Sequence, residues 1–587
     1  MQRAVKSMSC TLIGDESLLV QCGEMLRDRG HAIVAVVTAT DTIASWARTH
    51  DLPVLAPDSD LETKLAPYAY DWLFSIANLR KVPEGVWRRA REGSANFHDG
   101  PLPRYSGLNT PVWAILAGET RYGITWHALS DGIDEGDILA TRDLEISDDE
   151  TALTLNTKCF EAGMASFGEL LDKIESGTLQ GKAQASEGRT YFAKHARPRA
   201  AATIDFRQTT AEIARLTRAL DFGARYANPL ALPKIRTRHG AFAVAELEVG
   251  AADGVHPAGT VVSVADDGAV VAAADGIVRI KALRDSAGEA VPLSRVLYAG
   301  DVLETLDASE AERLTVLASE LAKAESYFRA QLKGARTPDI QGLQPASQDS
   351  PAASTTTVPL SRPADWSADD TIAALACFFA RTGNQARFQI AYVDDRLAAD
   401  NAAFAGYLAP TVPLTFDTDA ETTVAALKSA AAAVLAEARR RRGYAADLVN
   451  RTPDLPPGPA GIAIRQTDAP DTATAVSGSV LTFVVPQGGG DIRVLADSAR
   501  IAPGSIDAIA RQIGALFEAL KADGCPERVA DLPVMSREEI RALVVDRNRT
   551  TETPYDRDAL VHRLIEAQVA RSPDATALIS DGETLTY

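Results

Sequence analysis

The sequence predicts an α/β protein made of a sheet of parallel strands, a small β-barrel and a second, partial α/β lobe. An apolar run at 9–14, a helical pattern and another apolar run at 32–37 form the strand–helix–strand order of a parallel sheet. Short, glycine-bounded alternating strands within 200–305 are typical of a small barrel. Beyond 365, Ala-rich helical stretches and a strand-like run indicate another α/β unit.

Further elements follow in chain order. Residues 70–76 and 124–129 read as buried strands, 210–220 as a helix and 306–333 as helical. The glycines after the first strand do not form a dinucleotide-binding motif. Residues 334–364 are rich in Pro, Ser and Thr, which predicts a flexible linker. In the lobe at 365–535 we expect helices at 367–382, 420–442 and 505–520 and a strand at 480–485.

Composition argues against several classes of protein. The 587 residues carry a net charge of −19 and a pI near 5.0, which disfavours nucleic-acid binding. No apolar run is long enough to span a membrane, and the first residues do not read as a signal peptide. We therefore expect a cytoplasmic protein with no membrane partner and no metal site, since its cysteines are widely spaced buried thiols: Cys10, Cys22, Cys159, Cys377 and Cys525.

The segments most informative about chemistry are 96–107 and 123–137. Asn96 and His98 alternate on a short strand, so their side chains point the same way. The second segment is a strand followed by a glycine-spaced acidic turn, which can bring Asp134 next to the imidazole. An amide and a protonated imidazole can stabilise an oxyanion, and a carboxylate would orient the imidazole and raise its pKa. This set suits acyl transfer to an amine, although an Asn-x-His pair in a loop is more often structural.

The two segments resemble the signature of the 10-formyltetrahydrofolate-dependent formyltransferases. The family's Asn-x-His-x-x-x-Leu-Pro-x-Tyr-x-Gly pattern matches Asn96, His98, Leu102, Pro103, Tyr105 and Gly107. Its catalytic aspartate falls on Asp134, and the resemblance covers roughly residues 8–190. The barrel at 200–305 is similar to the C-terminal domain of the tRNA-type enzymes.

This resemblance implies a Rossmann-like catalytic domain at 1–195, a barrel subdomain at 200–305 and 10-formyltetrahydrofolate as formyl donor. It assigns catalysis to Asn96, His98 and Asp134. It places the folate, largely through main-chain groups, against Leu79, Arg80, Val82, Ser130 and Asp131.

The chain departs from the family pattern after the histidine, where Asp99-Gly100 replaces the usual Pro-Ser. Asp99 is either a harmless loop variant or a contact for a cationic acceptor, and Tyr105 is a second candidate for substrate contact. His127, on the strand before the acidic turn, is interpreted as structural.

The C-terminal third carries a second resemblance, to nonribosomal peptide synthetases. Residues 365–535 resemble part of a condensation domain, and 536–587 resemble the exit linker and the start of an adenylation domain. A condensation domain needs adjacent histidines, yet none occurs between His256 and His562, and the region has about half the expected length. The lobe is therefore expected to be a catalytically empty remnant.

Together these observations favour an initiation formyltransferase of natural product biosynthesis, such as that of an antibiotic or siderophore. Its acceptor would be an aminoacyl group on a carrier domain, with an adenylation domain downstream. Formylation of a free small amine, such as a hydroxyornithine-type side chain or an amino sugar, is the alternative. tRNA is disfavoured by the net charge, and a non-catalytic docking scaffold by the intact Asn96, His98 and Asp134.

Overall fold

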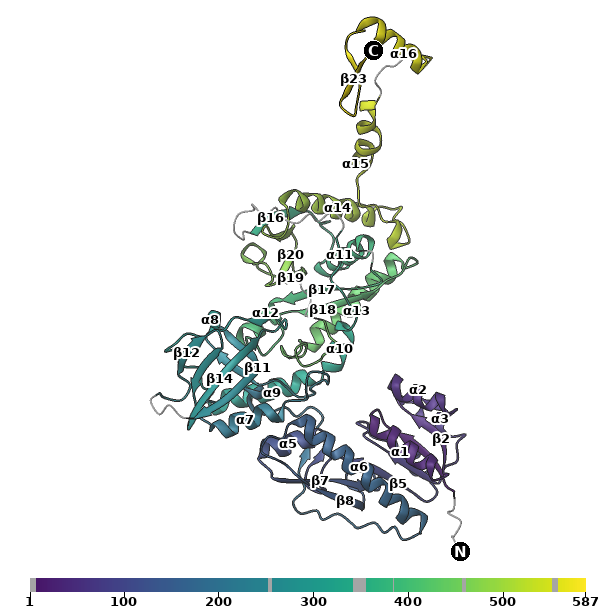
Figure 1. Ribbon diagram of the computed structural model, residues 1–587, viewed down its shortest axis with the longest axis vertical. Helices are drawn as coiled ribbons and strands as arrows, with labels where there is room; N and C mark the ends of the chain where they lie inside the picture. The colour runs from purple at the N-terminus through teal and green to yellow at the C-terminus, as the bar shows by residue number, and fades with distance from the viewer. Residues whose placement is uncertain (1–6, 252–255, 341–354, 384, 457–460, 552–557) are drawn as a thin grey trace.

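The computed structural model describes residues 7–251, 256–340, 355–383, 385–456, 461–551 and 558–587. Three consecutive sheet-containing units and a C-terminal extension follow one another along the chain (Figure 1). Where the structure describes the chain, no helix is long and apolar enough to cross a membrane. Of the linker predicted at 334–364, residues 341–354 lie outside the described residues.

The first unit contains a seven-stranded sheet in the order β3-β2-β1-β4-β5-β7-β8. Strands β1 to β5 are parallel, whereas β7 and β8 run antiparallel to their neighbours, so the predicted α/β sheet is mixed. Its strands are β1 (Ser9–Ile13), β2 (Ala32–Val37), β3 (Val54–Leu55), β4 (Trp72–Ser75), β5 (Gly93–His98), β7 (Arg121–His127) and β8 (Ile138–Glu145). The helices are α1 (Ser17–Asp28), α2 (Asp41–Thr49), α3 (Leu61–Leu65), α4 (Glu84–Trp87), α5 (Thr110–Ala117) and α6 (Ala152–Glu175).

The second unit is a six-stranded antiparallel sheet in the order β10-β11-β14-β13-β12, with β15 paired to β14. Its buried face forms a separate apolar core, which includes Ile235, Val271 and Ile280. Among the described residues β10 and β12 do not pair with each other, so the ladder of the predicted barrel stays open. Its elements are α7 (Thr210–Ala219), β10 (Lys234–Thr237), β11 (Gly240–Ala251), β12 (Val261–Ala265), β13 (Gly268–Ala272), β14 (Gly276–Arg284), β15 (Ala290–Val291) and α8 (Leu293–Val296).

Residues 306–333, expected to be helical, form two helices, α9 (Ala308–Ala322) and α10 (Glu325–Leu332). The third unit is a mixed sheet in the order β16-β21-β20-β19-β17-β18. Its edge strand β16 (Thr355–Leu360) lies inside the predicted linker, so that prediction is wrong for these residues. The only large apolar side chains of β16 are Val358 and Leu360, which pack in the core of this unit, and main-chain pairing to β21 orders the rest of the strand.

The expected helices of this lobe are α11 (Ala368–Thr382), α13 (Val424–Arg441) and α14 (Pro503–Lys521), and the expected strand is β20 (Ser479–Pro486). The remaining elements are β17 (Arg387–Asp394), α12 (Asp395–Ala403), β18 (Val412–Asp417), β19 (Gly461–Thr467) and β21 (Ile492–Asp497). The extension contains α15 (Arg537–Arg541), α16 (Val561–Arg571), β22 (Thr576–Ser580) and β23 (Glu583–Thr586), and it stands away from the other units (Figure 1).

Buried charges join the units. Lys234 of β10 contacts Asp447 of the third unit, with 2.5 Å between Nζ and Oδ2. Asp447 also accepts from Arg451, whose guanidinium pairs with Glu325 of α10. Glu325 lies 3.1 Å from the guanidinium of Arg197, in the segment that leaves the first unit. The exposed fraction of each of these side chains is 9% or less.

Burial alone would raise the pKa of Asp447, but the charges of Lys234 and Arg451 outweigh it and hold this pKa well below its usual range. The cluster holds three cations and two anions. Main-chain carbonyls of Ala201 and Leu232 accept further hydrogen bonds from Lys234. The third unit is therefore attached to the other two by a desolvated polar network, and not only by a linker.

Asp447→Ala should destabilise the protein by about 3–5 kcal/mol, because it leaves Lys234 and Arg451 buried without their carboxylate. The measurement is urea unfolding of the full chain. Asp417→Ala is the matched control: its carboxylate is 70% exposed and pairs with Arg387, so its loss should cost no more than about 1 kcal/mol. Equal effects of the two substitutions would contradict the assigned importance of the buried network.

Candidate active site

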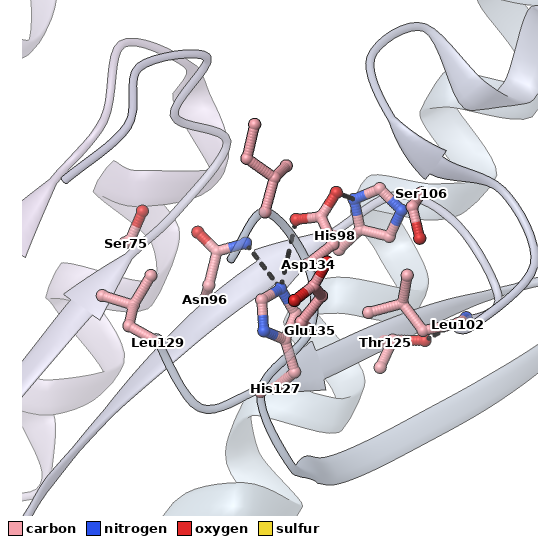
Figure 2. Close-up of polar contacts among 12 residues, drawn as sticks. Ser75, Asn96, His98, Leu102, Ser106, Thr125, His127, Leu129, Asp134 and Glu135 are labelled. Atoms are coloured by element: carbon pink, nitrogen blue, oxygen red, sulfur yellow. Dashed lines mark hydrogen bonds and ion pairs between the residues drawn. The ribbon is translucent and has the colours of Figure 1, made fainter. Parts of the chain in front are cut away.

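The antiparallel pairing of β5 and β7 places the central side chains. Asn96 and His98 are two residues apart on β5 and share one face, as predicted. The register sets His127 directly opposite Asn96, so their side chains are neighbours across the strands. The Asn96 Nδ2 atom lies 3.1 Å from His127 Nε2, and Figure 2 shows the two groups facing each other.

Asp134 reaches this pair from the turn that follows β7. Its Oδ1 atom is 3.4 Å from His127 Nε2 and its Oδ2 atom is 3.7 Å from His98 Nδ1 (Figure 2). The main-chain N–H of Gly107 donates to the same carboxylate at 2.8 Å. The structure thus brings together all three predicted catalytic residues and adds a fourth side chain, His127.

The turn is held in place by neighbouring segments. Asp134 has φ 55°, a left-handed conformation that aspartate tolerates better than most residues. Gln184 donates to the carbonyls of Asp134 and Gly136 at 2.9 and 2.6 Å. At Gly136 a Cβ atom would lie 1.8 Å from the carbonyl oxygen of Ala128, so only glycine fits. These contacts fix the carboxylate against both imidazoles.

Burial by itself would raise the pKa of Asp134. The charge of His98, the hydrogen bond from His127 and the N–H of Gly107 oppose it and lower this pKa to about 2. Asp134 is therefore a carboxylate at neutral pH.

His98 is 5% exposed, and its hydrogen bonds define its tautomer. Nε2 lies 2.7 Å from the main-chain oxygen of Tyr105, an atom that can only accept, so Nε2 carries a proton. Nδ1 then faces the carboxylates of Asp134 and Asp99, at 3.7 and 3.9 Å. His127 is arranged similarly, with Nδ1 donating to Ala128 O at 2.8 Å and Nε2 facing Asn96 and Asp134.

Asp99 lies in a recess beside His98, with its side chain 28% exposed. Its Oδ1 atom accepts from Thr110 Oγ1 at 3.1 Å, and its main-chain oxygen accepts from Tyr122. Burial raises the pKa of Asp99, although the charge of His98 opposes this, and the nearby Asp134 raises it further. A cation that reached the recess would find a partly accessible carboxyl group there.

The predicted folate-binding residues lie on two loops next to these side chains. Leu79 is 69% exposed, and Asp131 accepts from Lys81 through its main-chain oxygen at 2.9 Å. Arg80 is held by Asp15, and Ser130 caps its own turn at Gly132. Val82 is 6% exposed and packs in a small core, so only its main chain is available to a ligand.

Tyr105 does not present its side chain to this site. Its main-chain oxygen binds His98, whereas its buried phenol donates to Glu119 at 2.8 Å and its ring stacks on Phe192. The prediction that Tyr105 contacts substrate therefore finds no geometric support in the side chain.

His127, interpreted from the sequence as structural, contacts both Asn96 and Asp134. The signal that could have found it is strand register, since a strand antiparallel to β5 must place one residue opposite Asn96. The sequence alone did not show that β7 pairs with β5.

Comparison with known proteins fits this geometry. Residues 12–170 match the family model described as formyl transferase, and residues 198–298 match the formyl transferase C-terminal domain. Two consecutive segments of the chain are thus similar to the N- and C-terminal domains of formyl transferases.

Relatives of these formyl transferase domains include methionyl-tRNA formyltransferases. That of Anaeromyxobacter dehalogenans strain 2CP-C is 32% identical over 188 residues, which cover 29% of this chain and 60% of the relative. That of Geobacter metallireducens is 26% identical over 275 residues, 44% of this chain and 85% of the relative. The chain thus spans about 60% of the length of the former protein.

Two solved structures are similar to parts of the chain. One is the N-formyltransferase of Helicobacter canadensis in complex with folinic acid and dTDP-3-aminofucose, with 19% identity and a TM-score of 0.38 over 46% of this chain and 98% of that one. The other is HypX of Aquifex aeolicus in complex with tetrahydrofolic acid, with 20% identity and a TM-score of 0.37 over 49% of this chain and 47% of that one.

The low pKa of Asp134 has a consequence for stability. Because this pKa is lowered from 3.8 to about 2 on folding, the carboxylate stabilises the folded state above pH 3.8, and this stabilisation is lost as pH falls through about 2. The difference in unfolding free energy between the wild type and Asp134→Asn should shrink by on the order of 2 kcal/mol as the pH is lowered from about 5 to about 2. Urea titrations at a series of pH values measure it.

Asp137→Asn is the control, because Asp137 is exposed on the same turn and makes no ion pair with any described residue. Its difference from the wild type should change less over the same range. A pH-independent difference for Asp134→Asn would show that His98 and His127 do not stabilise the carboxylate.

Proposed function

We propose that the formyl transferase domains transfer a formyl group from 10-formyltetrahydrofolate to an amine. The observation that carries this proposal is the grouping of Asn96, His98 and an ionised Asp134 at the β5–β7 pair. An amide and an imidazole can donate to an oxyanion, and a fixed carboxylate orients the imidazole. An amine acceptor attacks directly, so no serine or cysteine nucleophile is required.

The residues beside this group suit a ligand that is partly a flat ring system. Leu79 and Ile133 are 69% and 45% exposed, although both are large and apolar, and they lie on the two predicted folate loops. Covering them with a ring would remove apolar surface from water. The main-chain groups of 79–82 and 130–131 would then hold the polar edge, and the bound folate would supply the formyl carbon.

The protein's own groups have separate roles in this proposal. His98 has Nε2 bound to Tyr105 O and Nδ1 beside Asp134, so the hydrogen bond that it donates to the oxygen that becomes negative comes from Nδ1. Asn96 has its amide N–H groups directed at Phe97 O and His127. His127 Nε2 also faces Asp134 Oδ1 at 3.4 Å, and a turn of the Asn96 amide would present one of its N–H groups to the substrate oxygen. Asp134 relays the proton that the attacking amine loses to the folate nitrogen that gives up the formyl group, so the new C–N bond forms as the old one breaks.

We further propose that the acceptor is an aminoacyl group carried as a thioester, at the start of a peptide assembly line. The resemblance of 365–535 to part of a condensation domain and of 536–587 to the start of an adenylation domain supports this context. The extension also exposes large apolar side chains at Val561, Leu564 and Ile579, which is typical of elements that pack within a larger domain. The lobe would act as a catalytically empty platform in the cytoplasm.

Charge argues against tRNA as acceptor. Residues 200–305 contain thirteen Asp and Glu residues and eleven Lys and Arg residues, and the whole chain has a net charge of −19. Binding to tRNA needs a basic face that neutralises phosphates. A free small amine, such as a hydroxyornithine-type side chain or an amino sugar, is the second candidate, favoured by the partly exposed carboxyl of Asp99 beside His98.

In the deciding experiment the full chain is incubated with 10-formyltetrahydrofolate and candidate acceptors. Mass spectrometry then follows the gain of about 28 Da that an acceptor shows when a formyl group replaces a hydrogen. The acceptors are aminoacyl carrier proteins, free amino acids, hydroxyornithine, an amino sugar and aminoacyl-tRNA. We expect the carrier-bound acceptors to be formylated fastest. Absence of formyl transfer to every acceptor, together with absence of folate binding, would favour the docking scaffold.

His98→Ala should lower turnover by at least about a hundredfold, the usual cost of losing a group that donates a proton or hydrogen bond in the transition state. Single-turnover formylation measures it. His50→Ala, on the periphery of the same domain, is the control and should retain normal turnover. A rate within a few fold of the wild type would remove His98 from the mechanism.

Asp99→Asn tests whether Asp99 contacts the acceptor. If it binds the acceptor's ammonium group, KM should rise more than kcat falls, because the lost interaction is made in the ground state as well. Steady-state kinetics against acceptor concentration measure both constants, with Asp137→Asn as control. An unchanged KM would identify Asp99 as a loop variant.

A further inference from the structure

A cavity of about 750 Å³ lies between the two formyl transferase domains, apart from the candidate active site. Helix α5 and residues 190–192 form one side of it, and residues 198–208 and helix α7 form the other. Its volume is within the range of cavities that hold small molecules. Tyr105 separates it from the active site, because its main-chain oxygen binds His98 while its side chain lines the cavity.

Each carboxylate in the lining already has a partner. Glu119 pairs with Arg104 and accepts from the Tyr105 hydroxyl. Asp205 is held by both ends of the Arg207 guanidinium, with Nε–Oδ1 and Nη2–Oδ2 distances of 3.0 and 2.7 Å. Glu212 accepts from the main chain and hydroxyl of Thr209, both at 2.9 Å.

Two arginines in the lining do not make such short side-chain contacts. Arg199 and Arg215 form no ion pair or side-chain hydrogen bond with any residue that the structure describes. Arg215 is only partly exposed, and its guanidinium lies over Gly118, where a Cβ atom would be 2.0 Å from Nη1. Arg199 interacts electrostatically with Asp205 and Arg215 with Glu212, but the N–H groups of both guanidiniums donate to no described side chain and are available to a ligand anion.

Aromatic rings form another part of the lining. Trp113 and Phe192 stack with centroids 5.0 Å apart and planes inclined by 7°, and Phe192 stacks in turn on Tyr105 at 5.7 Å and 16°. Trp113 and Phe192 are partly exposed, so the stack presents aromatic surface to the cavity. Stacked planes of this kind accept a further flat ring at low cost.

We propose that this cavity is a second ligand site, which binds a phosphate or carboxylate attached to a flat ring. Arg199 and Arg215 hold the anion, since a guanidinium matches the geometry of both groups. The ring packs against the Trp113 and Phe192 surface. The site is separate from the formyl transfer chemistry, so its occupancy does not depend on the proposed function.

The test uses 2-naphthyl phosphate as probe and isothermal titration calorimetry on the full chain. We expect saturable binding that is weakened at least about tenfold in Arg199→Gln/Arg215→Gln, because two charge-assisted hydrogen bonds are lost. Arg142→Gln is the matched control: Arg142 is 40% exposed and pairs with Glu169, and neither residue lines the cavity, so this variant should bind the probe normally.

Inorganic phosphate should bind at least about tenfold more weakly than the probe, because it lacks the ring. Unchanged far-UV circular dichroism shows that the double variant is folded. Equal binding by the double variant and the wild type would overturn the site, as would the absence of saturable binding at millimolar probe. Equal affinity for phosphate and probe would overturn the role of the rings.

Discussion

The buried charges of Lys234, Asp447, Arg451, Glu325 and Arg197 determine how the units of this chain fit together. Each of these charged groups is nearly inaccessible to water. Removing one of them would leave its partner buried and unpaired, which costs several kcal/mol of folding free energy (about 3–5 kcal/mol). The network spans the exit of the catalytic domain, the β10 strand, the α10 helix and the third unit. Folding of the third unit and orientation of the first two units are therefore coupled through one polar interface.

In the candidate active site, too, hydrogen bonds and neighbouring charges offset the cost of burying a charged group. Asp134 is mostly buried, yet two imidazoles and one main-chain N–H keep it ionised. Its turn is held by the hydrogen bond from Gln184 and by the close contact of Gly136 with Ala128, residues that would have no role in the chemistry. Positioning of one carboxylate thus depends on segments before and after it in the chain.

Much of this arrangement could be predicted from local patterns. Alternation on one strand predicted that Asn96 and His98 share a face, and the glycine-spaced turn predicted an aspartate beside them. Helices α7, α11, α13 and α14 were expected from their periodicity, because a helix buries a stripe repeated every three to four residues. Strand β16 could not be expected, since its order comes from pairing with β21, more than one hundred residues away in the chain.

By itself the sequence determined the chemistry on offer: an amide, an imidazole and a carboxylate at a spacing that resembles the formyltransferases, and no histidine pair in the lobe. Tertiary structure alone decided that His127 joins the site, that Tyr105 turns its side chain away, and that Arg199 and Arg215 line one cavity. The reason is that residue types and the periodic spacing of apolar side chains can be recognised from neighbouring positions of the chain. Cross-strand register, burial and the pairing of charges depend on segments that only folding brings together.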